Sequence, residues 1–469
     1  MAKKKSSGKK KSSSTISTKK VVKATAKLAK ANPALLAVII VAMILVVGGA
    51  IAGYFAYRYF NPEVAFKLVG RNEVSVGLDT TYHEKGVVAK YNGKDITDQV
   101  EISYYDGTNK MSTIPTNVER QYTVKYNLNY QKYTGELTRM VNVTDIEPID
   151  INFLELGNKY TGDSTFIKAG DADILIDAGS RQASAETIAN FIDQYCDDGK
   201  LEYVIATHAH QDHIAGFVGT DSVDGIFKRY QIDTLIDFSL TNADTKLYKD
   251  YVKIRDQRIE SGDIAHHYTA NECVQETNGA QKVYDIAVGI TMEILDQKFY
   301  RELDKNDENN HSVCTMFTQG ENYYLFTGDL EKDGEASLVE LNNLPEVTLF
   351  KGGHHGSYTA NTDKLLSVIK PRNICICCCA GSDEYTKTNA NMFPAQNAIT
   401  RMARWTDQIF VTTVVSNNEQ GYESMNGIIT AHSTKGTNCI ITGSNNSMIL
   451  KDTDWFKKNR SWPNYTYNW

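Results

Sequence analysis

The 469-residue sequence lacks several features that would assign it to a specialised class of protein. It has 8 prolines and 4 tryptophans, and its apolar and charged fractions of 41% and 23% are those of an ordinary globular protein, which excludes disorder of the whole chain. Its 8 cysteines include no pair of CxxC motifs, which excludes a four-cysteine structural zinc site. Four of them crowd into 375–379, inside an apolar run typical of a buried strand, so no disulfide framework is expected.

Acidic residues are missing from the first 60 positions, which hold twelve Lys and Arg. The rest of the chain therefore has 38 basic against 57 acidic side chains, a net charge of −19. Broad, sequence-independent binding of a nucleic-acid backbone needs clustered Lys and Arg, so this balance argues against it, although it permits a local basic groove. Residues 1–31 are basic and polar, and we expect them to form a disordered cytoplasmic tail.

One apolar run is long enough to cross a bilayer as a helix. It extends over residues 32–57, follows the basic tail, and leads into an aromatic belt that ends with Tyr59 and Phe60. The excess of Lys before the run predicts a single-pass membrane anchor, with the N-terminus in the cytoplasm and the bulk of the chain outside the cell. The alternative is a cleaved signal peptide with Ala50-Ile51-Ala52 as its cleavage site.

Beyond the anchor the sequence changes pattern twice. Residues 62–146 contain short runs rich in Val, Thr and Tyr, separated by Gly, Asn and Asp, which predict a small β-sandwich spacer. Its runs at 121–126 and 139–143 resemble strands of the Ig-like modules of bacterial surface proteins. Residues 147–445 alternate strand and helix patterns and predict a layered α/β domain, and residues 446–469 form an aromatic C-terminal tail.

A histidine cluster is the strongest indication of function. The apolar run 203–206 predicts a buried strand, and His208, His210, Asp212 and His213 follow it in a loop. Imidazole and carboxylate groups are good ligands for zinc and similar divalent ions, and this spacing can supply two adjacent metals. A chance polar loop is a poor explanation for three histidines and one aspartate within six residues.

Further predicted strands also border on acids or histidines. These are Asp177 after 173–176, His311 before 313–317, Asp329 in Thr-Gly-Asp after 323–326, and His354 and His355 between glycines after 347–351. In this order the motifs resemble the metallo-β-lactamase superfamily. The Gly-His-His-Gly-Ser element is similar to the extracellular metallohydrolase domain of the ComEC family of DNA-uptake competence proteins, and to the choline-binding phosphorylcholine esterases. The resemblance covers residues 149–445.

The resemblance implies an αββα metallo-β-lactamase sandwich with its site at one edge, where loops from strand ends meet. The implied ligands are His208 and His210 for one ion, Asp212 and His213 for the other, Asp329 as a bridge, and His354 or His355 to complete the shell. The sequence leaves open which of these last two histidines is the ligand. Asp177 would hold a ligand histidine by its far ring nitrogen, and His311 would be a ligand or a substrate contact.

The resemblance also implies a reaction. Two divalent ions, zinc or alternatively manganese, would activate a bridging hydroxide for attack on phosphorus or on a carbonyl carbon. The predicted catalytic side chains are Asp212, His355 and Ser357, of which Ser357 would hydrogen-bond a phosphate oxygen. Competence-type relatives commonly carry a His-Pro pair further along the chain, where this sequence has Phe393-Pro394. This departure weighs against a direct transfer of nuclease activity.

The sequence thus predicts a membrane-anchored extracellular metallohydrolase that cuts a phosphoester, with DNA or RNA as the first candidate substrate. The alternative enzyme is an esterase acting on cell-surface phosphodiesters of the phosphocholine or teichoic-acid type, because an acidic ectodomain suits a small head group. A non-catalytic surface binding protein is the third hypothesis. The sequence identifies no protein partner.

Overall fold

The computed structural model describes residues 33–416 and 421–464 of the chain. The predicted basic tail at 1–31 lies outside the described residues, as does Trp469 of the predicted aromatic tail. The chain divides into two compact units. The first holds the residues up to Asn72 with Glu84–Ser103 and Val124–Arg139, and the second holds Glu73–His83, Tyr104–Thr123 and Met140–Trp469.

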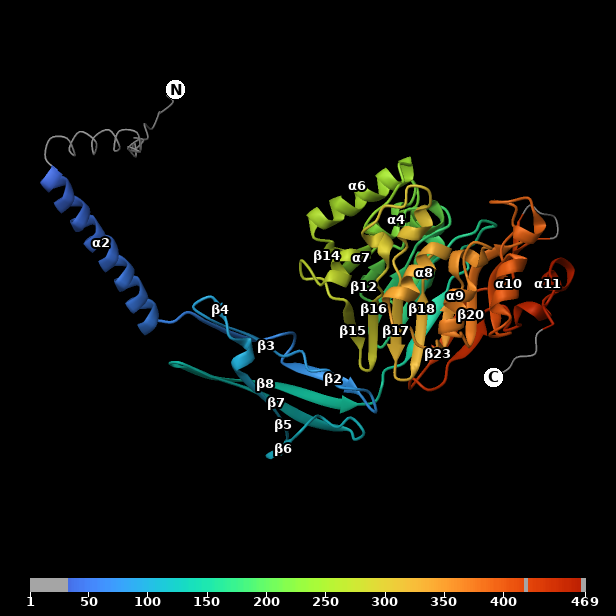
Figure 1. Ribbon diagram of the computed structural model, residues 1–469. Helices are drawn as coiled ribbons and strands as arrows, with labels where there is room; N and C mark the ends of the chain where they lie inside the picture. Colours follow the sequence, from blue (N-terminus) through green and yellow to red (C-terminus); the bar gives the residue numbers. More distant parts are fainter. Residues whose placement is uncertain (1–32, 417–420, 465–469) are drawn as a thin grey trace, which may run out of the picture. The chain divides into compact units, whose positions relative to one another are not determined.

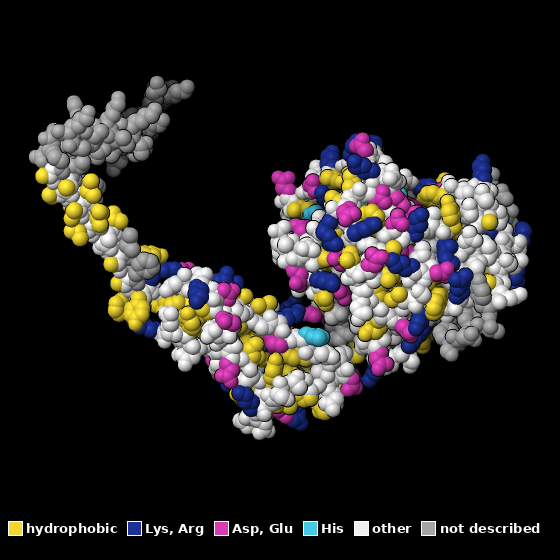
Figure 2. All heavy atoms as spheres, in the orientation of Figure 1, with side chains coloured by type: hydrophobic (Ala, Val, Ile, Leu, Met, Phe, Trp, Pro, Cys, Tyr) yellow, Lys and Arg dark blue, Asp and Glu magenta, His cyan; other side chains and the backbone are white. Residues whose placement is uncertain are grey.

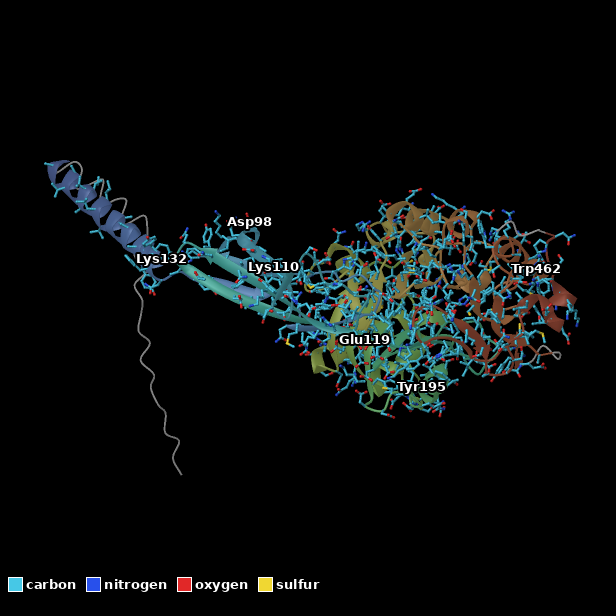
Figure 3. All side chains as sticks on the ribbon, turned by 90° about the horizontal axis from the view of Figure 1, so that it is seen from below. Asp98, Lys110, Glu119, Lys132, Tyr195 and Trp462 are labelled. Carbon is cyan, nitrogen blue, oxygen red and sulfur yellow. The ribbon has the colours of Figure 1, made fainter. Side chains whose placement is uncertain are left out.

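The first unit contains the apolar helix α2 (Pro33–Phe60). Its stretch Ile40–Phe60 has a mean hydropathy of 2.1, so by length and composition this helix could cross a membrane. Figure 2 shows hydrophobic side chains along the helix, and Val46 is 71% exposed. At the end of α2 (Figure 3), the Lys132 Nζ lies 3.9 Å from the centre of the Tyr59 ring, a cation–π contact.

Short strands between residues 64 and 144 form two sheets. One has the strand order β1 (Val64–Leu68), β3 (Val87–Tyr91) and β4 (Lys94–Asp95). The other has the order β2 (Glu73–Gly77), β8 (Tyr133–Thr144), β7 (Arg120–Tyr130), β5 (Val100–Asp106) and β6 (Asn109–Met111). These strands contain the predicted runs at 121–126 and 139–143. The Ig-like assignment and the domain boundaries drawn from the sequence stay predictions.

The buried side chain of Arg139 contacts several segments of the first unit. The guanidinium of Arg139 is 1% exposed and donates to Glu84 Oε1 at 2.5 Å. It also donates to the main-chain oxygens of Val69 and Arg71. The ring of Tyr126 lies 5.7 Å from the guanidinium carbon. The hydrogen bonds satisfy the buried guanidinium, and through them Arg139 joins segments that are far apart in the sequence.

The second unit contains two eight-stranded sheets. The first has the order β14 (Ile264–Thr269), β13 (Gln231–Asp237), β12 (Lys200–Ile205), β11 (Ala172–Ile176), β10 (Thr165–Ala169), β9 (Ile149–Phe153), β23 (Ile429–Ser433) and β24 (Ile440–Gly443). The second has the order β15 (Val283–Ala287), β16 (Ile290–Ile294), β17 (Thr315–Gln319), β18 (Asn322–Phe326), β19 (Leu349–Lys351), β20 (Asn373–Ala380), β21 (Ile409–Val415) and β22 (Tyr422–Ser424). Strands β11 to β14 are parallel, as are β18 to β21. The carboxyl ends of several strands therefore meet at one edge of each sheet.

The two sheets pack face to face. Phe153 of β9 stacks on Phe326 of β18 with ring centres 6.1 Å apart, and one continuous apolar core draws residues from both sheets. The alternation along β20 shows the layering, because Cys375 and Cys377 lie in this inner core while Ile376 lies in a second core. All eight cysteines are free.

Helices cover the outer faces of the sandwich. The helices of the first half are α3 (Ser184–Ile192), α4 (Gln211–Val218), α5 (Ile226–Arg229), α6 (Lys246–Ser261) and α7 (Ala270–Gln275). Those of the second half are α8 (Lys332–Leu341), α9 (Asp363–Ile369), α10 (Gln396–Met402) and α11 (Asp454–Asn459). Figure 1 shows α8, α9 and α10 beside β18 and β20, where they share the second core. Trp455 and Trp462 of the predicted aromatic tail pack against the same core, and the mixed α/β fold is confirmed.

Candidate metal centre

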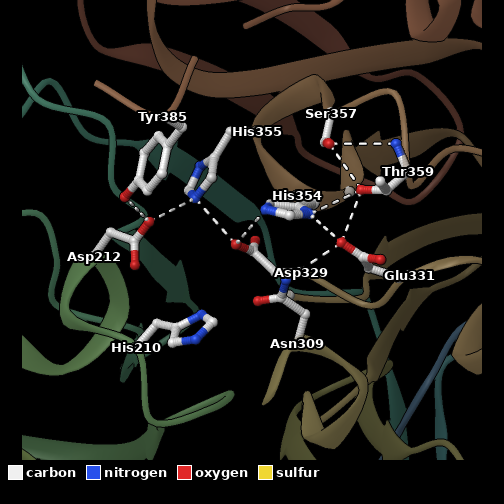
Figure 4. Close-up of polar contacts among 12 residues, drawn as sticks. His210, Asp212, Asn309, Asp329, Glu331, His354, His355, Ser357, Thr359 and Tyr385 are labelled. Atoms are coloured by element: carbon white, nitrogen blue, oxygen red, sulfur yellow. Dashed lines mark hydrogen bonds and ion pairs between the residues drawn. The ribbon is translucent and has the colours of Figure 1, made fainter. Parts of the chain in front are cut away.

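Loops from both sheets bring acids and histidines together at one edge of the sandwich (Figure 4). The run His208–His213 follows β12, and helix α4 begins at Gln211 with His210 as its N-cap residue. Asp329 follows β18, and the double histidine follows β19 in the 3-10 turn η4 (Gly353–Gly356). Residues distant in the sequence therefore meet because strand ends share an edge.

The carboxylate of Asp329 lies at the centre of this group. Its Oδ2 is 3.0 Å from His213 Nε2 and 3.1 Å from His355 Nε2. The same oxygen is 3.9 Å from His354 Nε2. His213 and His355 are fully buried. They follow strands of different sheets, and Asp329 contacts both imidazoles.

His355 and His354 differ in the contact that the Nδ1 atom of each ring makes. His355 Nδ1 lies 2.9 Å from the main-chain oxygen of Cys377, which leaves Nε2 facing Asp329. His354 Nδ1 lies 3.2 Å from Glu331 Oε1, on the far side of the ring from the cluster. Both histidines have positive φ angles, 53° and 46°, a backbone conformation that non-glycine residues adopt mainly under tertiary constraint. Of the two, His355 is the one inside the buried group.

Asp177 fixes the orientation of His213. Its Oδ2 lies 2.7 Å from His213 Nδ1 and accepts from the Thr207 hydroxyl at 2.7 Å, and its Oδ1 accepts from the Thr207 main-chain N–H at 2.7 Å. With Nδ1 as the donor to Asp177, the Nε2 atom of His213 is directed at Asp329. Such outer contacts orient metal-binding histidines and raise their basicity.

Asp212 reaches the cluster from the first turn of α4. Its Oδ2 accepts a hydrogen bond from the Tyr385 hydroxyl at 2.6 Å and lies 3.4 Å from His355 Nε2. Its main-chain oxygen accepts from the N–H of Asp163 at 2.9 Å. Gly179 packs so closely here that a Cβ on it would lie 1.6 Å from that same oxygen, so only glycine fits at this position.

His208 and His210 form a second donor pair. His208 Nε2 lies 3.1 Å from His210 Nδ1, although His208 is buried and His210 is exposed. Between them, the Ala209 N–H donates to Glu308 Oε1 at 3.1 Å, which ties this turn to the 3-10 turn η3 (Glu308–His311). Burial, followed by the neighbouring His213 and His210, holds the pKa of His208 well below its usual range, so its ring is neutral and able to bind a cation.

Two charged residues of this site were missed by the sequence reasoning. Asp163 is buried with its Oδ1 3.4 Å from His355 Nδ1, and Lys351 contacts Asp163 through Nζ. The same Nζ lies 3.7 Å from Asp329 Oδ1. Asp163 stands in Thr-Gly-Asp, the tripeptide that also contains Asp329, and this repeat is the signal that could have revealed it.

Buried acids and imidazoles perturb one another strongly. Burial lowers the pKa of His213, but Asp329 and Asp177 outweigh burial and raise it to about 10. Burial also lowers the pKa of His355, and Asp329 and Asp163 raise it well above its usual range. In the other direction, burial raises the pKa of Asp329, but the imidazoles of His213 and His355 hold it well below its usual range. A cation entering this cluster would displace protons from the imidazoles.

The donor set fits a divalent cation. Asp163, His213, Asp329 and His355 each offer one ligand atom, and these atoms lie within 4.8 Å of one another. Among the described residues, the Nε2 atoms of both histidines and the Asp329 Oδ1 are buried without a hydrogen bond of good geometry, although both Nε2 atoms lie within ion-pair distance of Asp329 Oδ2. Leaving such atoms unsatisfied is costly, and nitrogen and carboxylate donors suit zinc or manganese.

Ser357 and His311 lie apart from this group. The Ser357 hydroxyl is buried and pairs with the Thr359 hydroxyl at 2.8 Å, on the Glu331 side of His354. The ring nitrogens of His311 face main-chain oxygens of Phe299 and Asp304, at 3.1 and 3.3 Å. His311 therefore contacts the backbone of its own loop rather than the carboxylates of the cluster.

A comparison with known protein families covers the part of the chain that holds the histidine cluster. The profile of the metallo-β-lactamase superfamily matches residues 157–220, which contain the histidine cluster. ComE operon protein 3 of Bacillus subtilis is 22% identical over 182 residues, which is 38% of this chain and 20% of that protein. Recombination protein 2 of Haemophilus influenzae is 34% identical over 64 residues, which is 14% of this chain and 8% of that protein.

Among solved structures, the HARLDQ-motif metallo-β-lactamase of Cronobacter sakazakii is 14% identical, with a TM-score of 0.25, over 44% of this chain and 79% of that one. This chain spans a fifth or less of the length of the two curated relatives. The superfamily profile falls on the strand, loop and helix that carry the histidine cluster. Residues 157–220 thus match the metallo-β-lactamase superfamily, and the chain has weak sequence similarity to ComE operon protein 3 and Recombination protein 2.

Proposed function

We propose that this protein is a metal-dependent phosphodiesterase that acts on DNA or RNA outside the cell. One observation carries the proposal, the contact of Asp329 Oδ2 with His213 Nε2 and His355 Nε2 at 3.0 and 3.1 Å. A buried carboxylate between two imidazoles is a donor arrangement suited to a cation. The resemblance of the motif order to competence proteins supports a phosphoester of nucleic acid as the substrate.

The residues divide into two donor groups. His213, Asp329 and His355 would hold one cation, with Asp212 beside them, and the pair His208–His210 would contribute to a second. Bound divalent ions supply Lewis acidity and activate water for attack. The protein positions these donors in advance, since Asp177 directs His213 and the oxygen of Cys377 directs His355.

Lys351 balances the charge of the centre. The residue is 3% exposed, and its ammonium lies against Asp163, near Asp329 and the main-chain oxygen of Gly328. Burial lowers the pKa of Lys351, but Asp163 and Asp329 outweigh burial and raise it, so the side chain stays charged. A fixed positive charge beside several buried carboxylates reduces their mutual repulsion without occupying a donor atom of the histidines.

A hollow beside the cluster has room for the remainder of a substrate. Its volume is about 450 Å³, and two of its lining residues, Glu331 and Thr359, contact His354. Lys332 and Arg401 line it as well, and Tyr358 presents an aromatic side chain that is 50% exposed. Exposed aromatic rings can stack on bases, and cationic side chains can contact phosphates.

The proposed position of the enzyme follows from α2. A helix of this length and hydropathy suits a single membrane span, and the Lys-rich sequence before it favours a cytoplasmic N-terminus. The metal centre would then face the outside of the cell. Cysteine labelling of the full-length protein in intact cells, with a membrane-impermeant reagent and a cysteine introduced at an exposed loop of the second unit, tests this orientation.

A substrate panel tests the activity. The full-length protein in detergent, loaded with Zn²⁺ or Mn²⁺, is incubated with single- and double-stranded DNA, RNA, bis-p-nitrophenyl phosphate and a choline phosphodiester. We expect nucleic acid to be cut, with loss of activity in Asp329→Asn and His210→Ala and on addition of a chelator. The matched control is His432→Ala, because this histidine pairs with Asp150 away from the centre and should leave the rate unchanged.

A second candidate is an esterase of small surface phosphodiesters, such as those of phosphocholine or teichoic acid. The observation that favours it is the balanced charge of the hollow, where Glu331 and Asp363 offset Lys332 and Arg401. Cleavage of the choline ester with DNA and RNA left intact would select this candidate. A metal-loaded protein that hydrolyses nothing in the panel would instead support a non-catalytic surface protein.

A further inference from the structure

A closed loop, residues 381–393, lies over the metal centre. The N–H of Gly381 donates to the main-chain oxygen of Phe393 at 2.8 Å, so the two ends of the loop meet. At its closing end the Phe393 ring packs on His354 and His355, with ring centres 5.7 Å apart in both cases. Within the loop, the ring of Tyr385 lies 5.6 Å from Phe393, and its hydroxyl reaches Asp212 (Figure 4).

The loop is held from two sides by buried or half-buried charges. Glu384, the neighbour of Tyr385, accepts from Arg181 at 2.5 Å and from the N–H of Thr161 at 3.0 Å. Arg460 holds the other half, because its guanidinium donates to Asn389 and to the main-chain oxygen of Met392. Both anchors lie outside the metal cluster. The position of the Tyr385 hydroxyl is therefore set by the fold rather than by the ligands that it touches.

We propose that Tyr385 is a positioning residue of the metal centre, whose hydroxyl holds the Asp212 carboxylate in the orientation that binds a cation. The inference rests on the metal centre of the proposed function and is independent of its substrate.

The contacts around Asp212 support this role. The hydrogen bond of 2.6 Å from Tyr385 to a carboxylate oxygen belongs to the short, charge-assisted class. Asp212 is 7% exposed whereas Tyr385 is 53% exposed, so the tyrosine covers the carboxylate on its solvent side. Phe393, the other aromatic side chain over the centre, has no polar atom. Tyr385 is thus the group through which this loop can act on a ligand.

The test measures metal affinity rather than turnover. Full-length wild type and Tyr385→Phe, both in detergent, compete for Zn²⁺ with a chromophoric chelator, and bound Co²⁺ reports ligand geometry through its visible absorption. The phenylalanine keeps the ring contact with Phe393 and removes only the hydroxyl. We expect the affinity to fall about 10- to 100-fold, the usual effect of losing a group that orients a metal ligand, together with a changed Co²⁺ spectrum.

A double-mutant cycle separates positioning from a general structural effect. In the Asp212→Asn background, Tyr385→Phe should change the affinity little further, because the two side chains act through one contact. Tyr195→Phe is the matched control, since this tyrosine packs on Phe166 away from the centre and should leave the affinity unchanged. Glu384→Gln should weaken binding in the same direction by loosening the loop.

The outcomes are distinguishable. A wild-type protein that binds no metal would refute the proposed function itself. Wild-type binding that Tyr385→Phe leaves unchanged, or an effect of equal size in the Asp212→Asn background, would overturn the role of Tyr385. Unchanged affinity in Glu384→Gln would overturn the part assigned to the loop anchor.

Discussion

Replacing Lys351 by methionine should destabilise the second unit more than any surface substitution of a lysine. The Lys351 side chain is 4% exposed, and its ammonium contacts Asp163 and lies 3.7 Å from Asp329. Methionine has a similar length and no charge, so the variant leaves Asp163 without the ammonium that contacts it and removes a positive charge from beside Asp329. The folded state then bears a desolvated negative charge that the unfolded chain exposes to water.

The expected size follows from this burial. Removing one partner of a buried ion pair costs about 3–5 kcal/mol, because the remaining charge stays uncompensated. For a domain of this size, 1 kcal/mol shifts the melting temperature by about 2–4 °C, so Lys351→Met should melt about 6–20 °C lower. Lys364→Met is the matched control, because Lys364 pairs with Glu340 at the surface and such pairs contribute about 0–1 kcal/mol.

Differential scanning fluorimetry of both variants in detergent, with and without Zn²⁺, measures the difference. Excess Zn²⁺ should restore part of the loss in Lys351→Met, because a cation in the cluster also compensates Asp163 and Asp329. It should not change the difference between Lys364→Met and wild type. Equal melting temperatures for Lys351→Met and wild type without metal would refute the charge-balancing role.

Three other results are expected. Gly179→Ala should lose metal binding, as measured by metal content after dialysis, because its Cβ would meet the Asp212 oxygen at 1.6 Å; full metal content would contradict this. Arg139→Met should lower the free energy of unfolding of the first unit by about 3–5 kcal/mol in urea titrations, because Glu84 loses its buried partner; no change would argue against that pairing. Burial raises the pKa of the Cys439 thiol from 9.0 to about 12, so the contribution of this thiol to stability should be constant below pH 9 and fall as the pH rises towards 12; the difference between wild type and Cys439→Ala in denaturation at stepped pH measures it, and a difference that does not change with pH would count against a buried thiol.

Much of the fold was predictable because buried strands have local signatures. The apolar runs at 173–176, 203–206 and 323–326 lie within or at the end of β11, β12 and β18, and each precedes a polar strand end. The Cys-rich run 375–379 lies within β20, where small apolar side chains alternate between two cores. The spacing of apolar residues and the composition of a short run depend only on residues that are neighbours in the sequence. A single sequence is therefore enough to recognise them.

The centre was less predictable because its support comes from distant segments. Tyr385 stands in a polar loop without periodicity, and Glu384 and Arg460 set its place through contacts across the fold. Asp163 precedes a strand, whereas the acids recognised from sequence follow one. His311 borders a strand as the ligand histidines do, yet its ring faces main-chain oxygens. Residue type alone could not separate these cases.

The sharing of the donor cluster between the two sheets has a mechanical consequence. His213 belongs to the first half of the sandwich, and Asp329 and His355 belong to the second. A single ion bound by these residues would link the two halves at this edge of the sandwich. The halves could then separate there only if coordination bonds were broken. Removal of the ion by a chelator would leave both halves folded but weaken the contact between them at this edge. Limited proteolysis should then cleave the loops at this edge first.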